Sequence, residues 1–75
     1  MSCDAETAVL GYFDSLDMCA EACFNDDCEF IHYDDNDGEC LSTFTESANC
    51  PEGVYESSYY NFYQILEANA VEEIV

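Results

Sequence analysis

The stretch that decides the fold is DSLDMCAEACFNDDCEFIHYDDNDGECLSTF, residues 14–44. Its first part predicts a helix over residues 14–24, because Asp14 or Ser15 can cap the amino end. Four side chains then recur at helical spacing and would share one face: Leu16, Cys19, Ala20 and Cys23. The remainder predicts a hairpin, with strands over residues 28–33 and 39–44 joined by an acidic turn.

The segments on either side of this stretch add extended structure. Residues 3–13 predict a strand that enters the core, and residues 45–53 predict a loop. Residues 59–65 carry aromatic side chains on both faces, which is typical of a strand covered on both sides. Residues 66–75 predict a short helical or loose acidic-apolar tail, so we place the domain at residues 1–65. The elements indicate an α+β fold: a small disulfide-rich domain with one helix packed on an antiparallel β-sheet.

The cysteine content indicates how so short a chain is held together. The six cysteines in 75 residues are Cys3, Cys19, Cys23, Cys28, Cys40 and Cys50. A chain of this length has a marginal core and usually needs staples, and an even number of cysteines favours disulfides in an oxidising compartment. A zinc site is disfavoured because no CxxC pair occurs and His32 is the only histidine. We therefore expect a secreted or extracellular protein, although spacing alone leaves the pairing of the cysteines open.

The charge excludes several classes of partner. The chain has 18 acidic residues and no Lys or Arg, which gives a formal charge of −18. Nucleic acids and anionic lipids are excluded because no cation is available to meet their phosphates. No apolar run is long enough to cross a bilayer, so no membrane insertion is expected. Cationic partners and divalent cations remain, as do two plainer explanations: solubility in salt, and excision between basic cleavage sites. The first residues do not form a signal peptide, and we interpret the sequence as a mature or trimmed form.

Three motifs together resemble the PAN/apple domain family. They are the helix with Cys19-Ala-Glu-Ala-Cys23, the strand Cys28-Glu-Phe-Ile-His-Tyr33, and Gly38-Glu-Cys40-Leu41. The resemblance covers roughly residues 3–65 and is most specific over residues 15–41. It implies a PAN/apple-like fold, and it implies the bridges Cys19–Cys40, Cys23–Cys28 and Cys3–Cys50.

The chain departs from the family in two respects. Cys50 precedes the aromatic strand, whereas apple-type members usually have their last cysteine near the end of the domain. The absence of Lys and Arg removes the basic patches that growth-factor members use for heparin-like glycans. Binding of sulfated glycans is therefore not carried over to this chain.

No catalytic residues are expected. His32 is the only candidate general base, no nucleophile is identifiable, and no cation is present to stabilise an oxyanion. We predict that the protein is not an enzyme, and that His32 is packed or exposed without a catalytic role.

Two groups of residues are candidate binding sites. The acidic turn offers carboxylates for calcium, the one cofactor considered: Asp34, Asp35, Asp37 and Glu39. The spacing does not fit an EF-hand, and a solvated turn is the alternative explanation. A stacking surface for a sugar or a protein is the second possibility, formed by Tyr55, Tyr59, Tyr60 and Tyr63, although about half of the aromatic residues must form the core.

Two functions follow as hypotheses. The first is a non-enzymatic extracellular recognition or adhesion module that binds a protein or a neutral glycan. The alternative is a self-assembling, cation-bridged subunit of an extracellular fibre, sheath or matrix, in which the tail docks on a neighbour. The apolar residues that would dock are Ile65, Leu66, Val71, Ile74 and Val75. A small toxin or protease inhibitor fits the size but lacks the basic contact residues that such proteins often use.

Overall fold

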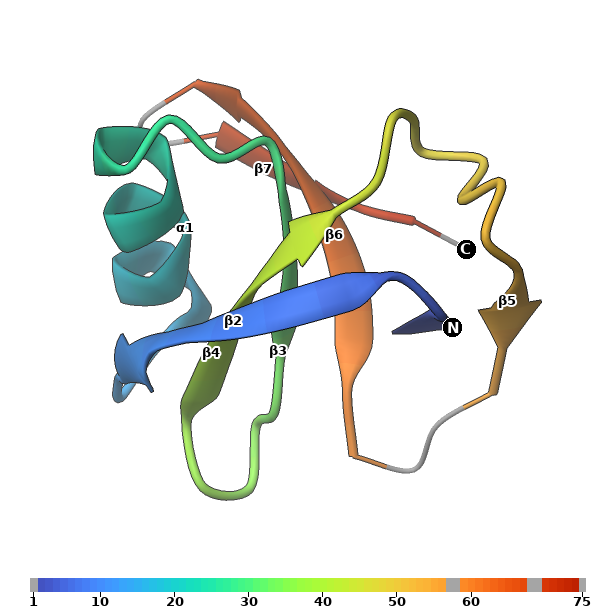
Figure 1. The fold of residues 1–75 in the computed structure, drawn as a ribbon. Coiled ribbons are helices and arrows are strands. Elements are labelled where there is room, and N and C mark those ends of the chain that lie inside the picture. The colour runs from blue at the N-terminus through green and yellow to red at the C-terminus, as the bar shows by residue number, and fades with distance from the viewer. Residues whose placement is uncertain (1, 57–58, 68–69, 75) are drawn as a thin grey trace.

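A computed structural model describes residues 2–56, 59–67 and 70–74. These residues form one helix and seven short strands (Figure 1). In chain order the elements are β1 (Ser2–Cys3), β2 (Glu6–Tyr12), α1 (Leu16–Asn25), β3 (Phe30–Tyr33), β4 (Glu39–Phe44), β5 (Val54–Tyr55), β6 (Asn61–Glu67) and β7 (Ala70–Glu73).

Five of the strands form an antiparallel sheet in the order β2-β4-β3-β6-β7. The central strand β3 is buried along its whole length, as a strand covered on both faces must be. Strands β1 and β5 form a separate two-stranded ladder, in which Cys3 pairs with Val54. The chain is therefore α+β with one helix on an antiparallel sheet, as predicted.

The large sheet has a hydrophobic core on each face. Helix α1 covers one face, where Cys19 and Cys23 pack with Ile31, Tyr33 and other buried side chains. On the opposite face a smaller core joins Phe30 and Phe62 to the Cys3–Cys50 bridge. Figure 1 shows α1 and β5 on opposite sides of the sheet. Neither core is large, so the bridges add stability that apolar burial alone would not supply.

Three disulfides staple these layers together. Cys19–Cys40 joins the helix to β4, Cys23–Cys28 closes the turn after the helix, and Cys3–Cys50 holds β1 to the loop before β5. Their Cα atoms lie 5.6, 4.9 and 5.7 Å apart, within the usual range for a bridge. These are the pairs that the PAN/apple resemblance implies.

Local signals define the helix and the hairpin as predicted. The Ser15 side chain caps α1 by accepting a 3.3 Å hydrogen bond from the Met18 N–H. The turn between β3 and β4 ends at Gly38, whose φ of +82° suits glycine. The Phe13 N–H donates to the Gly38 carbonyl oxygen over 2.8 Å, and a Cβ at Gly38 would collide with the Phe13 carbonyl oxygen. Gly38 therefore sets both the turn and the approach of the segment that enters the helix.

The carboxyl-terminal segment differs from the prediction of a loose tail beyond residue 65. Strand β6 continues to Glu67, and residues 70–73 form the edge strand β7, in which Val71 pairs with Ile65. Val71 packs against the helix-side core and Ile74 against the opposite core. The boundary placed at residue 65 is corrected: this segment is part of the domain. Within the described residues, no helix is long and apolar enough to cross a membrane.

Candidate functional site

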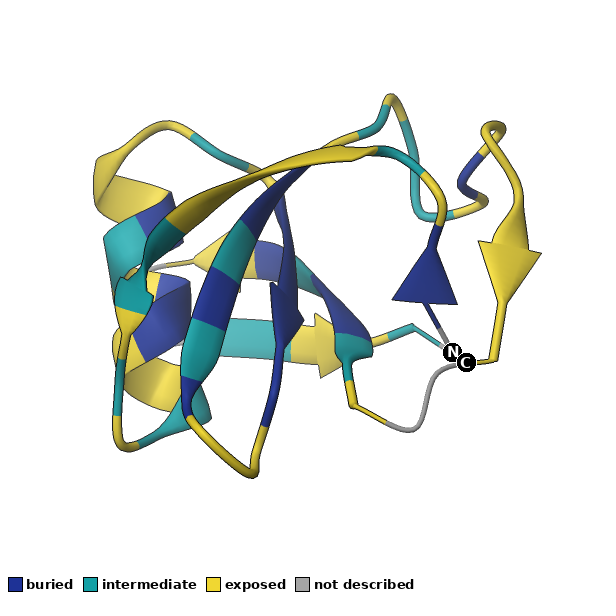
Figure 2. Cartoon of the chain, turned by 60° about the horizontal axis from the view of Figure 1, so that its bottom comes forward, coloured by how far each residue is buried: buried dark blue, intermediate teal, exposed yellow. Residues whose placement is uncertain are grey.

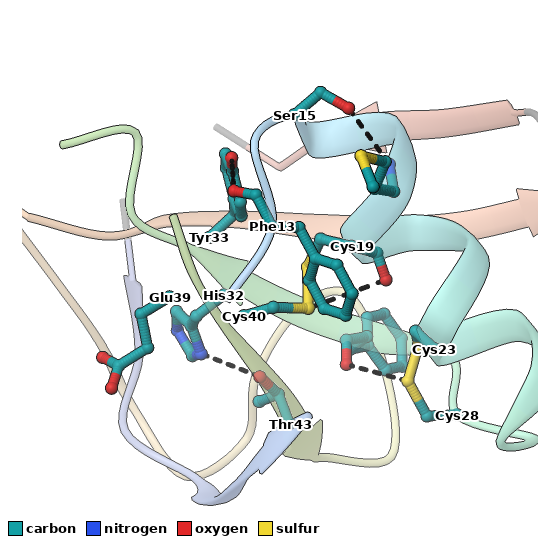
Figure 3. Close-up of a disulfide and its surroundings, with 12 residues drawn as sticks. Phe13, Ser15, Cys19, Cys23, Cys28, His32, Tyr33, Glu39, Cys40 and Thr43 are labelled. Carbon is teal, nitrogen blue, oxygen red and sulfur yellow. Dashed lines mark hydrogen bonds between the residues drawn. A yellow bond between two sulfur atoms is a disulfide. The ribbon is translucent and has the colours of Figure 1, made fainter. Parts of the chain in front are cut away.

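His32 lies inside the domain with both ring nitrogens engaged. Its side chain is 2% exposed, at the centre of β3. The Cys3 N–H donates a 3.0 Å hydrogen bond to Nε2, so Nε2 must be the unprotonated nitrogen. Nδ1 lies 2.7 Å from the Thr43 Oγ1 (Figure 3), and in this tautomer Nδ1 donates to that hydroxyl. The Phe62 ring stacks on the imidazole with 5.2 Å between centroids.

The environment of His32 keeps the ring neutral. Burial lowers the pKa of His32 to about 4, because a charged imidazolium would lose its hydration there. A group that is buried, neutral and hydrogen-bonded at both nitrogens is not placed to take a proton from a substrate. The histidine therefore acts as a polar link within the smaller core.

The carboxylates of the acidic turn shape the turn itself. The Asn36 N–H donates to Asp34 Oδ1 over 2.8 Å, and the Glu39 N–H donates to Asp37 Oδ1 over 2.9 Å. Both are side-chain contacts to the backbone two residues on, the pattern that favours Asp in turns. Asp35 is exposed. Two of the four residues considered for calcium thus have an oxygen committed to the backbone.

Glu39 is held between two tyrosines from distant parts of the chain. The Tyr12 hydroxyl donates to its Oε2 over 3.0 Å, and the Tyr60 hydroxyl donates to its Oε1. The hydrogen bond to Glu39, together with burial, raises the pKa of Tyr60 to about 12. This carboxylate joins the end of β2 to the segment before β6.

The acidic turn does not gather its carboxylates into a metal site. Across residues 2–56, 59–67 and 70–74, three or more ligand atoms approach one another only at Cys3, Cys50 and Glu52. The two sulfurs of that group are bonded to each other, so they are not thiolate ligands. The structure therefore favours the solvated-turn explanation of residues 34–39.

The four candidate tyrosines differ in exposure, and only Tyr63 is buried. Tyr55 is 47% exposed in β5 and Tyr59 is 66% exposed. Tyr60 is half-buried, and Tyr63 is 7% exposed and packs in the helix-side core. Tyr63 is thus corrected from a binding residue to a core residue, and Tyr55 and Tyr59 remain on the surface.

The structure also shows a groove that the sequence analysis missed. It has a volume of about 410 Å³ and lies where β3 and β4 diverge, at the end away from their connecting turn. Its wall includes Phe30 and Phe44, and its carboxylates come from Asp26, Asp27, Glu29 and Glu46. We call this feature the acidic groove. In the sequence, Asn25-Asp26-Asp27 directly follow the predicted helix, and only the tertiary fold brings the two aspartates beside residues 44–46.

Comparison of the chain with protein-family models, with curated proteins and with solved structures gives no match. The function proposed for the chain therefore rests on its own residues, charge and surface.

Proposed function

We propose that this protein is a non-enzymatic extracellular recognition or adhesion module of PAN/apple type that binds a protein or glycan partner. The observation that carries the proposal is the number of large apolar and aromatic side chains left on the surface of a disulfide-stapled scaffold. The exposed side chains include Val9, Tyr12, Met18, Phe24, Phe44, Val54, Tyr55, Tyr59 and Leu66. Exposed aromatic residues are common anchors of binding surfaces because they combine a large apolar area with a polar tip.

The scaffold supports this proposal in two ways. Every cysteine is in a bridge, which suits an oxidising compartment such as the extracellular space. The chain's only histidine, His32, is hydrogen-bonded to Cys3 and Thr43 inside the domain and does not line a cleft. The staples leave apolar side chains free for the surface, because the fold depends less on burying all of them.

One exposed surface that carries an aromatic side chain is strand β5. Val54 and Tyr55 are 52% and 47% exposed, and β5 is exposed along its length (Figure 2). Tyr59 follows in the chain and is 66% exposed. Flat phenol rings of this kind stack on the apolar faces of sugars and pack on protein side chains, and neither contact requires a cation from this chain.

The test is binding to arrays of neutral oligosaccharides and of peptides by the non-reduced protein. We expect the Tyr55→Ser, Tyr59→Ser double variant to lose at least about tenfold in affinity, or about 1.4 kcal/mol, for the partner that the array identifies. Leu66→Ser is the matched control, because Leu66 is 53% exposed but lies in β6, away from β5. Absence of binding on both arrays, or equal losses in the variants, would count against the proposal.

A second candidate function, the self-assembling subunit, is favoured by the edges of the large sheet. Among the described residues, strands β2 and β7 are the outer strands of the large sheet, so each offers backbone groups to an added strand. Of the apolar residues expected to dock on a neighbour, Val71 and Ile74 pack on their own domain, whereas Leu66 is exposed. Val75 lies outside the described residues. Edge-to-edge pairing of subunits with a charge of −18 needs bridging cations to offset repulsion.

Light scattering across a calcium titration, followed by chelator, tests this second function. Growth into large particles that chelator reverses, and that Val9→Lys on the exposed edge strand β2 abolishes, is the expected result for a subunit. A constant 8.4 kDa monomer would exclude cation-bridged assembly and leave the recognition module.

A further inference from the structure

We propose that the acidic groove binds a basic peptide segment of a partner protein, with an arginine or lysine among its carboxylates and an apolar neighbour against Phe44. This inference rests on the proposed recognition function and gives it a site and a class of partner. The groove lies apart from the exposed tyrosine of β5, which belongs to the small ladder with β1.

The shape of the groove follows from the register of β3 and β4. Phe30 and Thr43 form the last pair of the ladder, and beyond it residues 26–29 and 44–46 separate. Phe30 and Thr43, which are buried, and Phe44, which is 57% exposed, all line the groove. The opening of about 410 Å³ falls within the size range of small ligand sites, roughly 300–1,000 Å³. It therefore has room for one or two side chains of an extended peptide.

Helix α1 makes this end of the domain more negative. The helix ends at Asn25 with no basic residue in its last turn, and Asp26 and Asp27 follow directly. The carboxyl end of a helix carries a partial negative charge, so these two carboxylates stand where the dipole disfavours anions. Glu29 and Glu46 add two more carboxylates to the same groove.

The cation that would relieve this repulsion must come from another molecule. The chain contains no Lys or Arg, and its only histidine is buried and neutral in the smaller core. A basic segment of a partner therefore gains both Coulomb attraction and steering toward the groove, and the attraction weakens as salt is added.

The apolar wall favours a basic side chain of a peptide over a bare ion. A long cationic side chain lays its methylene groups on an apolar surface while its charged head reaches carboxylates. A guanidinium also stacks on an exposed ring such as that of Phe44. A divalent ion needs converging oxygens, and among the residues that the structure describes no three carboxylates converge within the groove.

The probe is a capped peptide in which arginine and leucine alternate, measured by calorimetry at low and at physiological salt. The groove variant is Asp26→Asn with Asp27→Asn, and the control variant is Asp35→Asn with Glu56→Gln. Each pair removes two charges from −18, but Asp35 lies in the turn at the other end of β3 and Glu56 follows β5. We expect the groove variant and Phe44→Ser each to bind about tenfold more weakly, and the control variant to change affinity by less than about twofold.

Amide chemical shifts locate the peptide and separate the possible outcomes. Shifts concentrated in residues 26–30 and 42–46 support the proposal. No binding at low salt, equal weakening by both charge pairs, or equal affinity for a peptide of alternating arginine and glycine would overturn it. If the groove fails while Tyr55 and Tyr59 still govern binding on the arrays, the recognition function survives without this site.

Discussion

The Cys3 N–H and the His32 Nε2 form a 3.0 Å hydrogen bond between the small β1–β5 ladder and the centre of the large sheet. Because Cys3 is also bridged to Cys50, Cys3 anchors the loop before β5 to the smaller core. A proton on Nε2 would break this hydrogen bond, since an imidazolium has no acceptor. The link therefore makes the attachment of the ladder sensitive to acid.

Stability should fall through the titration of His32. Its pKa is about 4 in the folded protein against 6.5 for an ordinary histidine, so between these values the unfolded chain binds more protons. The contribution of His32 is complete above about pH 6.5 and is lost as pH falls to about 4, with a magnitude on the order of 3 kcal/mol. Urea unfolding of the protein and of the His32→Gln variant at several pH values measures this contribution to the free energy of unfolding.

The comparison with His32→Gln is needed because protonation of the 18 acidic residues also changes stability. Glutamine can accept a hydrogen bond from the Cys3 N–H but does not titrate. The stability difference between the two proteins should shrink as pH falls from 7 to 4. A difference that stays constant would show that His32 does not titrate on unfolding.

Gly38→Ala should destabilise the protein by at least about 2 kcal/mol, because a methyl group meets the Phe13 carbonyl oxygen and the φ is +82°. Gly53→Ala is the control. Gly53 also has a positive φ, +119°, but an added Cβ there meets nothing within 4 Å. We expect a smaller loss at Gly53, of about 1 kcal/mol, from backbone strain alone. Thermal unfolding of both variants under non-reducing conditions shows which variant loses more stability. Equal losses of stability would rule out the contact with the Phe13 carbonyl oxygen as the cause.

Removal of a single bridge should cost more stability when the loop that the bridge closes is longer. Cys3–Cys50 spans 47 residues and Cys23–Cys28 spans 5, so chain entropy gives about 4 and about 2 kcal/mol respectively. The paired alanine variants keep all other cysteines bridged. Loss of Cys3–Cys50 should also speed hydrogen exchange in β1 and β5 before the large sheet. A larger loss from the Cys23–Cys28 variant would contradict the chain-entropy explanation.

Asp26→Asn with Asp27→Asn should stabilise the fold by roughly 0.3–1 kcal/mol, because two anions leave the carboxyl end of α1. Asn also suits residue 27, whose φ is +57°. Asp17→Asn in the first turn of the same helix should have the opposite sign. Denaturant midpoints of the two variants measure these effects. Destabilisation by the Asp26, Asp27 pair would mean that these carboxylates have a structural role.

The sequence predicted the parts of the fold that depend on local chemistry. A few adjacent residues determine each of three features: the Ser15 cap, the helix and the turn at Gly38. Strand β4 occupies the predicted range of residues 39–44. Strand β7 could not be predicted in this way. Its segment is only four residues long and includes two glutamates, which have low strand propensity. It forms a strand because it pairs with β6.

The candidate site followed the same division. Tyr63 and Tyr59 look alike in the sequence. Because the neighbours Phe62 and Tyr63, which point to opposite faces of β6, are both buried, alternation does not tell which ring is exposed. The carboxylates of Asp34 and Asp37 resembled ion ligands, but backbone N–H groups of their own turn take up an oxygen of each. The acidic groove combines residues 26–29 with residues 44–46, which no local pattern connects.

In the smaller core, Cys3 of β1 packs in one cluster with Ile74, which follows β7. During synthesis this cluster stays incomplete until residue 74 has left the ribosome, long after the helix and the β3–β4 hairpin have emerged. Folding should therefore proceed in two stages. Helix α1 and the β3–β4 hairpin can form on the nascent chain, whereas Tyr63 and Val71 complete the helix-side core and Ile74 completes the smaller core only afterwards.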